Sequence, residues 1–249
     1  MERSSGGGGG VPELPEVETT RRGIAALVEG CTVARVTVRE TRLRQPVPPD
    51  LAQLLCGHRL LGVDRRAKYL LFRFAHGTLI VHLGMSGSLR IAPPATEFRK
   101  HDHIEITFAG DRRRRFHDPR RFGLMIWSPD PIERHPRIAH LGPEPWDELI
   151  DAGYLHGAAR SRRAAVKNVI MDGRIVVGVG NIYASEALYR AGVHPKRAAG
   201  RVSLTRYAGI VHAIREVLAE AIEGGGPPPR DFVQSDGAPG YFRLQLNVY

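Results

Sequence analysis

The chain has 249 residues, of which 42% are hydrophobic and 25% charged, a balance typical of globular proteins. Its apolar runs fall short of the roughly 20 residues that a membrane-spanning helix needs, and two cysteines are too few for a disulfide framework or a closed zinc site. We therefore exclude a membrane role, expect a reducing cytoplasm, and note that a formal charge of +10 suits a polyanionic partner without identifying one.

The N-terminal residues change from a leader to a helix. Residues 1–11 contain the run Gly6 to Gly10 and show no hydrophobic period, so we interpret them as a disordered leader outside the mature protein. A helix is predicted from Pro15 to Val28, because proline begins it, acidic residues lie in its first turn and Gly30 follows its end.

Short segments rich in β-forming residues occupy the chain from Thr32 to Trp127. Several alternate with period two, and glycine or aspartate separates them. The predicted strands are Val33 to Val38, Leu60 to Val63, Tyr69 to Phe74, Thr78 to Leu83 and Ile104 to Phe108. Residues 12–128 are therefore predicted to form a β-sandwich or flattened barrel.

Five prolines lie between Ser128 and Pro145, which predicts a linker over residues 129–146. Helical periods follow, with helices expected over residues 182–191 and over 203–223, where Ser203 can serve as N-cap. Residues 147–249 are thus predicted to be a helical domain, and the fold class is α+β. The segment from Tyr241 to Tyr249 alternates like a strand without a partner, and we expect the natural chain to continue beyond it.

Two motifs each allow a functional and a structural interpretation. The segment Gly178-Val179-Gly180-Asn181 precedes a helix whose free amides can hold a phosphate, although a simple tight turn is about twice as probable from the motif alone. Phe122 follows Arg120-Arg121, which suits an intercalating wedge, or else it begins a buried strand to Trp127. Met85 is in the same way a wedge or an ordinary core residue.

The basic run Arg112 to Arg115 lies just upstream of the Phe122 motif. By itself, a run of this kind is usually a solvated face. Together with Arg120-Arg121 it makes this part of the chain a candidate surface for nucleic acid.

Five motifs, taken together, resemble bacterial formamidopyrimidine-DNA glycosylases in order and spacing from Pro12 to Tyr249. They are Pro12-Glu13-Leu14-Pro15-Glu16-Val17-Glu18, Ala67-Lys68-Tyr69, His82-Leu83-Gly84-Met85-Ser86-Gly87, Asp118-Pro119-Arg120-Arg121-Phe122-Gly123 and Gly178-Val179-Gly180-Asn181-Ile182-Tyr183. The resemblance implies an N-terminal β-sandwich beside a helical domain with a helix-two-turns-helix element, and damaged duplex DNA in the cleft between them. It also implies a monomeric bacterial enzyme that acts in the cytoplasm at the nucleoid.

The family's chemistry implies a set of catalytic residues. Pro12 would be the nucleophile, because an α-amino nitrogen titrates far below a lysine and a secondary amine forms a persistent iminium. Glu13 would shuttle protons, Glu16 is a second carboxylate, and Lys68 would assist β-elimination. The resemblance further implies that DNA is bound by His101, Arg120, Arg163, Lys167, Asn181, Met85 and Phe122.

The sequence departs from the family at both ends. Pro12 lies inside the chain, where its nitrogen is an amide, so we expect the true start at Val11, followed by removal of the initiator residue. The family also ends in a four-cysteine zinc finger, whose counterpart is missing from this sequence. We therefore expect no metal or other cofactor in this chain, weaker DNA binding and impaired δ-elimination.

Three alternatives compete with an oxidised-purine glycosylase. The first is a catalytically inactive protein that binds damaged DNA. The second is a sister glycosylase that prefers oxidised pyrimidines, and the third is an RNA-associated protein that shares only the helical element. The motifs at Pro12, Lys68 and Phe122 disfavour the third.

Overall fold

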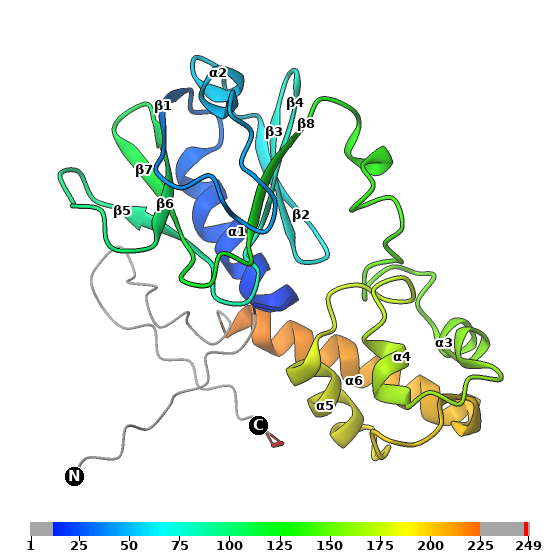
Figure 1. The fold of residues 1–249 in the computed structure, drawn as a ribbon. Helices are drawn as coiled ribbons and strands as arrows, with labels where there is room; N and C mark the ends of the chain where they lie inside the picture. The colour runs from blue at the N-terminus through cyan, green and yellow to red at the C-terminus, as the bar shows by residue number, and fades with distance from the viewer. Residues whose placement is uncertain (1–11, 225–246, 249) are drawn as a thin grey trace, which may run out of the picture.

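The computed structural model describes residues 12–224 and 247–248. Its N-terminal part contains α1 (Leu14–Val28) and two four-stranded antiparallel sheets, ordered β1-β6-β7-β5 and β2-β3-β4-β8 (Figure 1). The further bounds are β1 Val33–Val38, α2 Leu51–Leu55, β2 Gly62–Arg66, β3 Tyr69–Phe74, β4 Gly77–His82, β5 Ser88–Ala92, β6 Asp102–Phe108, β7 Arg112–His117 and β8 Leu124–Ser128.

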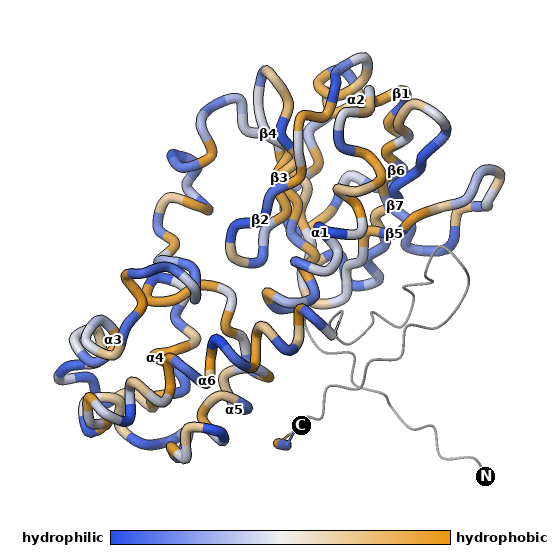
Figure 2. The backbone as a smooth tube through the Cα atoms, turned by 180° about the vertical axis from the view of Figure 1, so that it is seen from behind, coloured by the Kyte–Doolittle hydropathy of each residue, from blue (hydrophilic) through white to orange (hydrophobic). Residues whose placement is uncertain are grey.

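The two sheets bury their apolar residues against each other. One hydrophobic cluster joins Ile104 and Phe116 of the first sheet to Leu70 and Phe72 of the second. Figure 2 shows hydrophobic residues along β3 and β4 and hydrophilic ones in several of the connecting loops. This arrangement confirms the predicted β-sandwich and the α+β class.

The predicted strands agree with the structure to within a few residues at their ends. The strand at Tyr69–Phe74 matches in full, whereas β2 begins at Gly62 rather than at Leu60. The interpretation of Arg112–Arg115 as a solvated basic face was wrong, because these residues form most of β7, where Arg114 and Arg115 are only 2% and 4% exposed. The charges obscured the strand pattern in the sequence, although only Arg114 and Arg115 of the run are buried, and Arg115 there donates to Glu105 and to backbone carbonyl oxygens.

The C-terminal part is helical. It contains η1 Ile132–Arg134, α3 Ala152–Ala159, α4 Val166–Ile170, α5 Asn181–Arg190, η2 Ala199–Arg201 and α6 Leu204–Glu223. As predicted, Ser203 caps α6, and its hydroxyl accepts the Arg206 N–H at 3.4 Å. The predicted strand at Tyr241–Tyr249 lies outside the described residues, apart from 247–248.

Helix α1 connects the two parts of the molecule. It packs against β2 on one side and α6 on the other, and its N-terminal end lies beside the C-terminal end of α6 (Figure 1). At this end Gly178 is so close to Leu14 that an added Cβ would lie 2.2 Å from the Leu14 side chain. The Pro12-Glu13 motif is thereby brought to the helical part. Among the described helices, none is long and apolar enough to cross a membrane.

Candidate active site and nucleic-acid interface

Glu13 occupies the N-terminal ends of two helices at once. It is the N-cap residue of α1, and its Oε1 also accepts the Ile182 N–H at 3.0 Å, at the start of α5. A Cβ on Gly180 would lie 2.2 to 2.4 Å from the Glu13 carboxyl atoms, so glycine is required for this approach. The α5 terminus, for which a phosphate site and a simple tight turn were both considered, therefore holds the chain's own carboxylate.

The Glu13 carboxyl is 2% exposed, and burial raises its pKa above the ordinary 4.5. Lys68 and the backbone N–H groups at the start of α5 act in the opposite direction without cancelling the effect of burial. Oε2 is buried and has no hydrogen-bond partner among the residues that the structure describes. Glu13 is thus a buried acid with one oxygen free for proton transfer.

Glu16 supports Glu13 from within the same helix. Its Oε2 accepts the Glu13 N–H at 2.7 Å, and its Oε1 accepts the Tyr183 hydroxyl at 2.5 Å. Burial raises the pKa of Tyr183, with the neighbouring Glu16 adding to the effect, so the phenol remains a donor. This chain of contacts fixes the backbone next to Pro12, which is itself half-buried.

Lys68 lies in the turn between β2 and β3, near Glu13 and Glu16. Burial lowers the pKa of its amine below the ordinary 10.5, while Glu13 and Glu16 act in the opposite direction. Lys68 is thus half-buried and is not a fully exposed surface charge. The structure brings Glu13 and Lys68, two of the three residues predicted to be catalytic, close enough to affect each other's pKa, and Pro12 is adjacent to Glu13 in the chain.

The Lys68 turn is held by Glu144, which comes from the segment between β8 and α3. Glu144 Oε1 accepts the Ala67 N–H at 2.8 Å, and its carboxylate pairs with Arg65 at 2.8 Å and Arg66 at 3.0 Å. Ala67 has a φ of +53°, a strained conformation for a residue with a Cβ. Glu144 thus stabilises an unfavourable turn directly before the lysine.

Sequence reasoning missed Glu144, Tyr183 and His82 as parts of this site. Burial lowers the pKa of His82 to about 4, with the charge of Lys68 contributing, so this ring is neutral beside the amine. Glu144 lies between two prolines in a segment interpreted as a linker, and no local period indicates a partner 77 residues away. The motif that contains Tyr183 is evident in the sequence, but the partner of the Tyr183 hydroxyl, Glu16, depends on tertiary packing.

Met85 and Phe122 are exposed on two neighbouring loops of the sandwich. Their exposed fractions are 38% and 44%, and strand β8 begins only at Leu124. The alternative of a core methionine is therefore wrong. The buried strand that was considered from Phe122 to Trp127 exists, but it begins at Leu124 and leaves Phe122 exposed before it. The Arg120 guanidinium lies over the Phe122 ring at 4.9 Å, which places a cation beside an exposed aromatic side chain.

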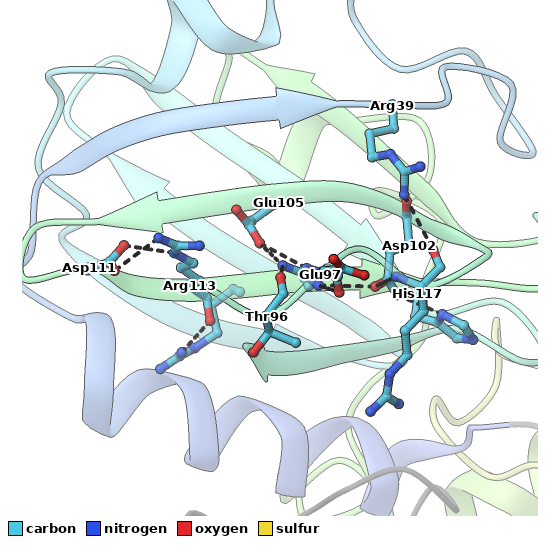
Figure 3. Close-up of polar contacts among 11 residues, drawn as sticks. Arg39, Thr96, Glu97, Asp102, Glu105, Asp111, Arg113 and His117 are labelled. Atoms are coloured by element: carbon cyan, nitrogen blue, oxygen red, sulfur yellow. Dashed lines mark hydrogen bonds and ion pairs between the residues drawn. The ribbon is translucent and has the colours of Figure 1, made fainter. Parts of the chain in front are cut away.

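His101 lies directly before β6 with a φ of +74°, and a buried polar network supports the chain on both sides of it. Arg115 binds Glu105 at 2.9 Å and donates to the carbonyl oxygens of Thr96 and Glu97, while Asp102 accepts from His117 at 2.8 Å (Figure 3). These contacts fix the backbone that presents His101.

The remaining predicted DNA-binding residues lie in the helical part. Lys167 Nζ donates to the Ser185 hydroxyl at 2.8 Å, and that hydroxyl donates to the Asn181 carbonyl at 2.9 Å. Arg163 and the Asn181 side chain are exposed. Lys167 and Asn181 thus meet at α4 and α5, separately from Met85, His101 and Phe122 on the sandwich. Within residues 12–224 and 247–248, no group of three or more His, Cys, Asp or Glu residues could hold a metal ion.

Comparison with known proteins identifies both parts of the fold. The model of the formamidopyrimidine-DNA glycosylase N-terminal domain matches residues 11–125, and that of the H2TH domain of the same enzymes matches residues 141–230. The formamidopyrimidine-DNA glycosylase of Methylococcus capsulatus is 59% identical over 239 residues, which cover 96% of this chain and 88% of that protein.

Solved structures support the same family assignment. The MutM (Fpg) protein from Thermus thermophilus superposes with a TM-score of 0.79 at 39% identity, covering 92% of this chain and 84% of that one. The Lactococcus lactis FPG (MutM) in complex with a Fapy-dG containing DNA has a TM-score of 0.80 at 30% identity, covering 86% of this chain and 82% of that one. Given these matches along most of its length, the chain belongs to the formamidopyrimidine-DNA glycosylase family.

Proposed function

We propose that the protein is a base-excision repair glycosylase with AP-lyase activity, which removes oxidised purines such as 8-oxoguanine and formamidopyrimidines from duplex DNA in the bacterial cytoplasm. The observation that carries this proposal is the buried cluster at the start of α1. There, the Glu13 carboxyl with its raised pKa faces Lys68 with its lowered pKa, next to Pro12. Perturbed acids and bases of this kind concentrate at catalytic sites. Relatives named for this activity support the choice of reaction.

In the proposed reaction, the Pro12 nitrogen attacks C1′ of the damaged nucleotide. The bond between C1′ and the base nitrogen breaks, and the departing base takes up a proton that Glu13 helps to deliver. The sugar ring then opens, which leaves an iminium between C1′ and the Pro12 nitrogen. The iminium then accepts the electrons released when the C2′ proton is lost and the 3′-phosphate departs. We assign assistance in this β-elimination to Lys68, because its amine lies in the turn beside Glu13 and its pKa is lowered by burial.

The reaction requires Pro12 to be the first residue, because the nitrogen of a proline inside a chain is a tertiary amide without nucleophilic character. The active form proposed here therefore begins at Pro12, with a free secondary amine. Lys68 and Glu13 retain their positions in this form, because Glu13 is held by Ile182 and Glu16 rather than by the residues before Pro12.

DNA binding is proposed to involve both parts of the molecule. Arg163, Lys167 and Asn181 contact phosphates from α4 and α5, and His101 and Arg120 do so from the sandwich. Met85, Arg120 and Phe122 fill the gap that the everted nucleotide leaves. Extrusion of a base costs a few kcal/mol, which these contacts must offset.

Borohydride trapping tests the proposal. The form that begins at Pro12 is mixed with duplex DNA containing 8-oxoguanine and reduced with borohydride, and the adduct is mapped by mass spectrometry. We expect a covalent link at the Pro12 nitrogen, and none when that nitrogen is acetylated or remains in the longer chain. If the form that begins at Pro12 binds the duplex but yields no adduct, the protein is instead an inactive one that binds damaged DNA. A preference for duplexes with oxidised pyrimidines would indicate the sister activity.

A further inference from the structure

Asp118 is a fully buried carboxylate directly after β7, with an exposed fraction of 0%. Its Oδ1 accepts the Ser86 hydroxyl at 2.7 Å and the Arg120 N–H at 3.3 Å, and its Oδ2 accepts the Gly123 N–H at 2.7 Å. These donors are one hydroxyl and two amides. Burial of a carboxylate is costly, and such a set of directed hydrogen bonds offsets this cost only while the geometry is kept.

The donors come from the two loops that carry Met85 and Phe122. Ser86 follows Met85 in the first loop, and Arg120 and Gly123 flank the second loop around Phe122. The two backbones also touch, because a Cβ on Gly84 would lie 2.5 Å from the Phe122 carbonyl carbon and from the Gly123 nitrogen. Gly84 has a φ of +68°, so glycine is favoured there for its conformation as well.

The backbone carbonyl of Asp118 also takes part in hydrogen bonds. His103 Nε2 lies 2.8 Å from its carbonyl oxygen, and the Arg121 N–H donates to the same oxygen at 3.2 Å. The Asp118 backbone is thus anchored to the first sheet, while its carboxylate accepts hydrogen bonds from both loops, Oδ1 from Ser86 and Arg120 and Oδ2 from Gly123. A shift of either loop would break a hydrogen bond to a buried charge.

We propose that Asp118 is a positioning residue that sets the distance between Met85 and Phe122, so that both side chains enter the duplex together. The proposal rests on the wedge role given to these two residues above. A fixed separation matters because unstacking is costly and an error of about 1 Å in placement can cost a hundredfold in rate. Through Ser86, the carboxylate couples the methionine loop to the phenylalanine loop.

The test uses the Ser86 hydroxyl, since Asp118→Asn can rotate its amide or fail to fold. Base eversion is followed by the fluorescence of 2-aminopurine placed next to the lesion, and base release is measured under single-turnover conditions. Each variant is compared on a fully paired duplex and on one with mismatches flanking the lesion, where stacking is already weak. Eversion can be measured even if the Pro12 chemistry is blocked.

We expect Ser86→Ala to slow eversion about tenfold on the paired duplex and little on the mismatched one. In a Met85→Ala background the same substitution should have no further effect, because Ser86 acts through Met85. Ser88→Ala is the matched control, since the Ser88 hydroxyl accepts from Arg90 at 3.1 Å instead. Its eversion rate should equal that of the unaltered protein.

Two results would overturn the inference about Asp118. One is an additive loss in the Ser86→Ala, Met85→Ala double variant, and the other is an equal loss on paired and mismatched duplexes. Failure of the wedge role is separately visible. In that case Met85→Ala and Phe122→Ala would themselves show no preference for the mismatched duplex, whatever Ser86→Ala does.

Discussion

Burial and the charge of the other residue together set the pKa values of Glu13 and Lys68. Burial raises the pKa of Glu13 and lowers that of Lys68, while the attraction between them acts against both shifts. The pKa values of the two groups are therefore moved toward each other, which favours the proton transfer proposed for this site. A carboxyl and an amine in water would be too far apart in pKa for this.

This coupling predicts a pH effect at the residue scale. If base release needs a neutral Pro12 nitrogen and a protonated Glu13, and the Pro12 nitrogen titrates above Glu13, the rate follows a bell-shaped profile. Its acidic limb then lies at the lower pKa, that of Glu13, and its basic limb at that of Pro12. Because the charge of Lys68 lowers the pKa of Glu13, Lys68→Gln should raise it further and move the acidic limb to higher pH. Single-turnover release of 8-oxoguanine, rather than strand cleavage, is the measurement.

Lys100→Gln is the control for this shift, because it removes an exposed lysine and should leave the acidic limb where it is. An acidic limb that stays in place in Lys68→Gln, or moves to lower pH, would show that Glu13 does not set it.

At the scale of elements, the meeting of α1 and α5 determines the geometry of the acid. Gly180→Ala would place a Cβ within 2.2 to 2.4 Å of the Glu13 carboxyl and displace it from the Ile182 N–H. We expect base release to fall at least about tenfold and stability to fall by about 1–3 kcal/mol. Single-turnover kinetics and urea unfolding measure the two effects.

Gly209 in α6 provides a matched substitution, since a Cβ there meets nothing within 4 Å. Gly209→Ala should leave base release unchanged and stabilise the protein by up to about 1 kcal/mol, because alanine favours a helix. Equal activity of the two variants would refute the role given to the Gly180 contact.

The segment between β8 and α3 supports the site through Glu144. Glu144→Gln removes the charge that pairs with Arg65 and Arg66 and weakens the hold on the Lys68 turn. Loss of these charged hydrogen bonds should cost about 1–3 kcal/mol in unfolding free energy. Borohydride trapping should slow as well, whereas Glu148→Gln, at an exposed position of the same segment, should change neither quantity. A loss of stability with normal trapping would leave Glu144 a purely structural role.

At the scale of the whole molecule, the excess of positive charge strengthens DNA binding only through the residues that contact phosphates. The exposed Arg163 is proposed to contact a phosphate, so Arg163→Gln should weaken binding of all duplexes alike and lower the slope of log Kd against log salt by about 1. Fluorescence anisotropy at several salt concentrations measures this slope. Arg134→Gln, at an exposed position of η1, should preserve it. An unchanged slope for Arg163→Gln would remove this residue from the interface.

Local patterns in the sequence are sufficient where neighbouring residues decide the structure. The helix predicted from Pro15 to Val28 begins one residue earlier, at Leu14, and the strand at Tyr69–Phe74 and the Ser203 cap were predicted as they are observed. These features depend mainly on local sequence patterns. The motifs around Glu13, Lys68 and Phe122 likewise indicated the family, because their residue types and order suffice for a resemblance.

Only the tertiary structure decided which charges are buried and which partners they meet. Arg114 and Arg115 lie in the interior of a sheet, Glu144 binds a turn 77 residues away, and Glu13 lies at the start of a helix that begins 168 residues later. A side chain's pKa and position depend on desolvation and on partners brought together by the fold, and neither leaves a local period in the chain. The sequence thus determined several of the elements and the resemblance to the family, whereas packing determined strands such as β7 and the chemistry of the site.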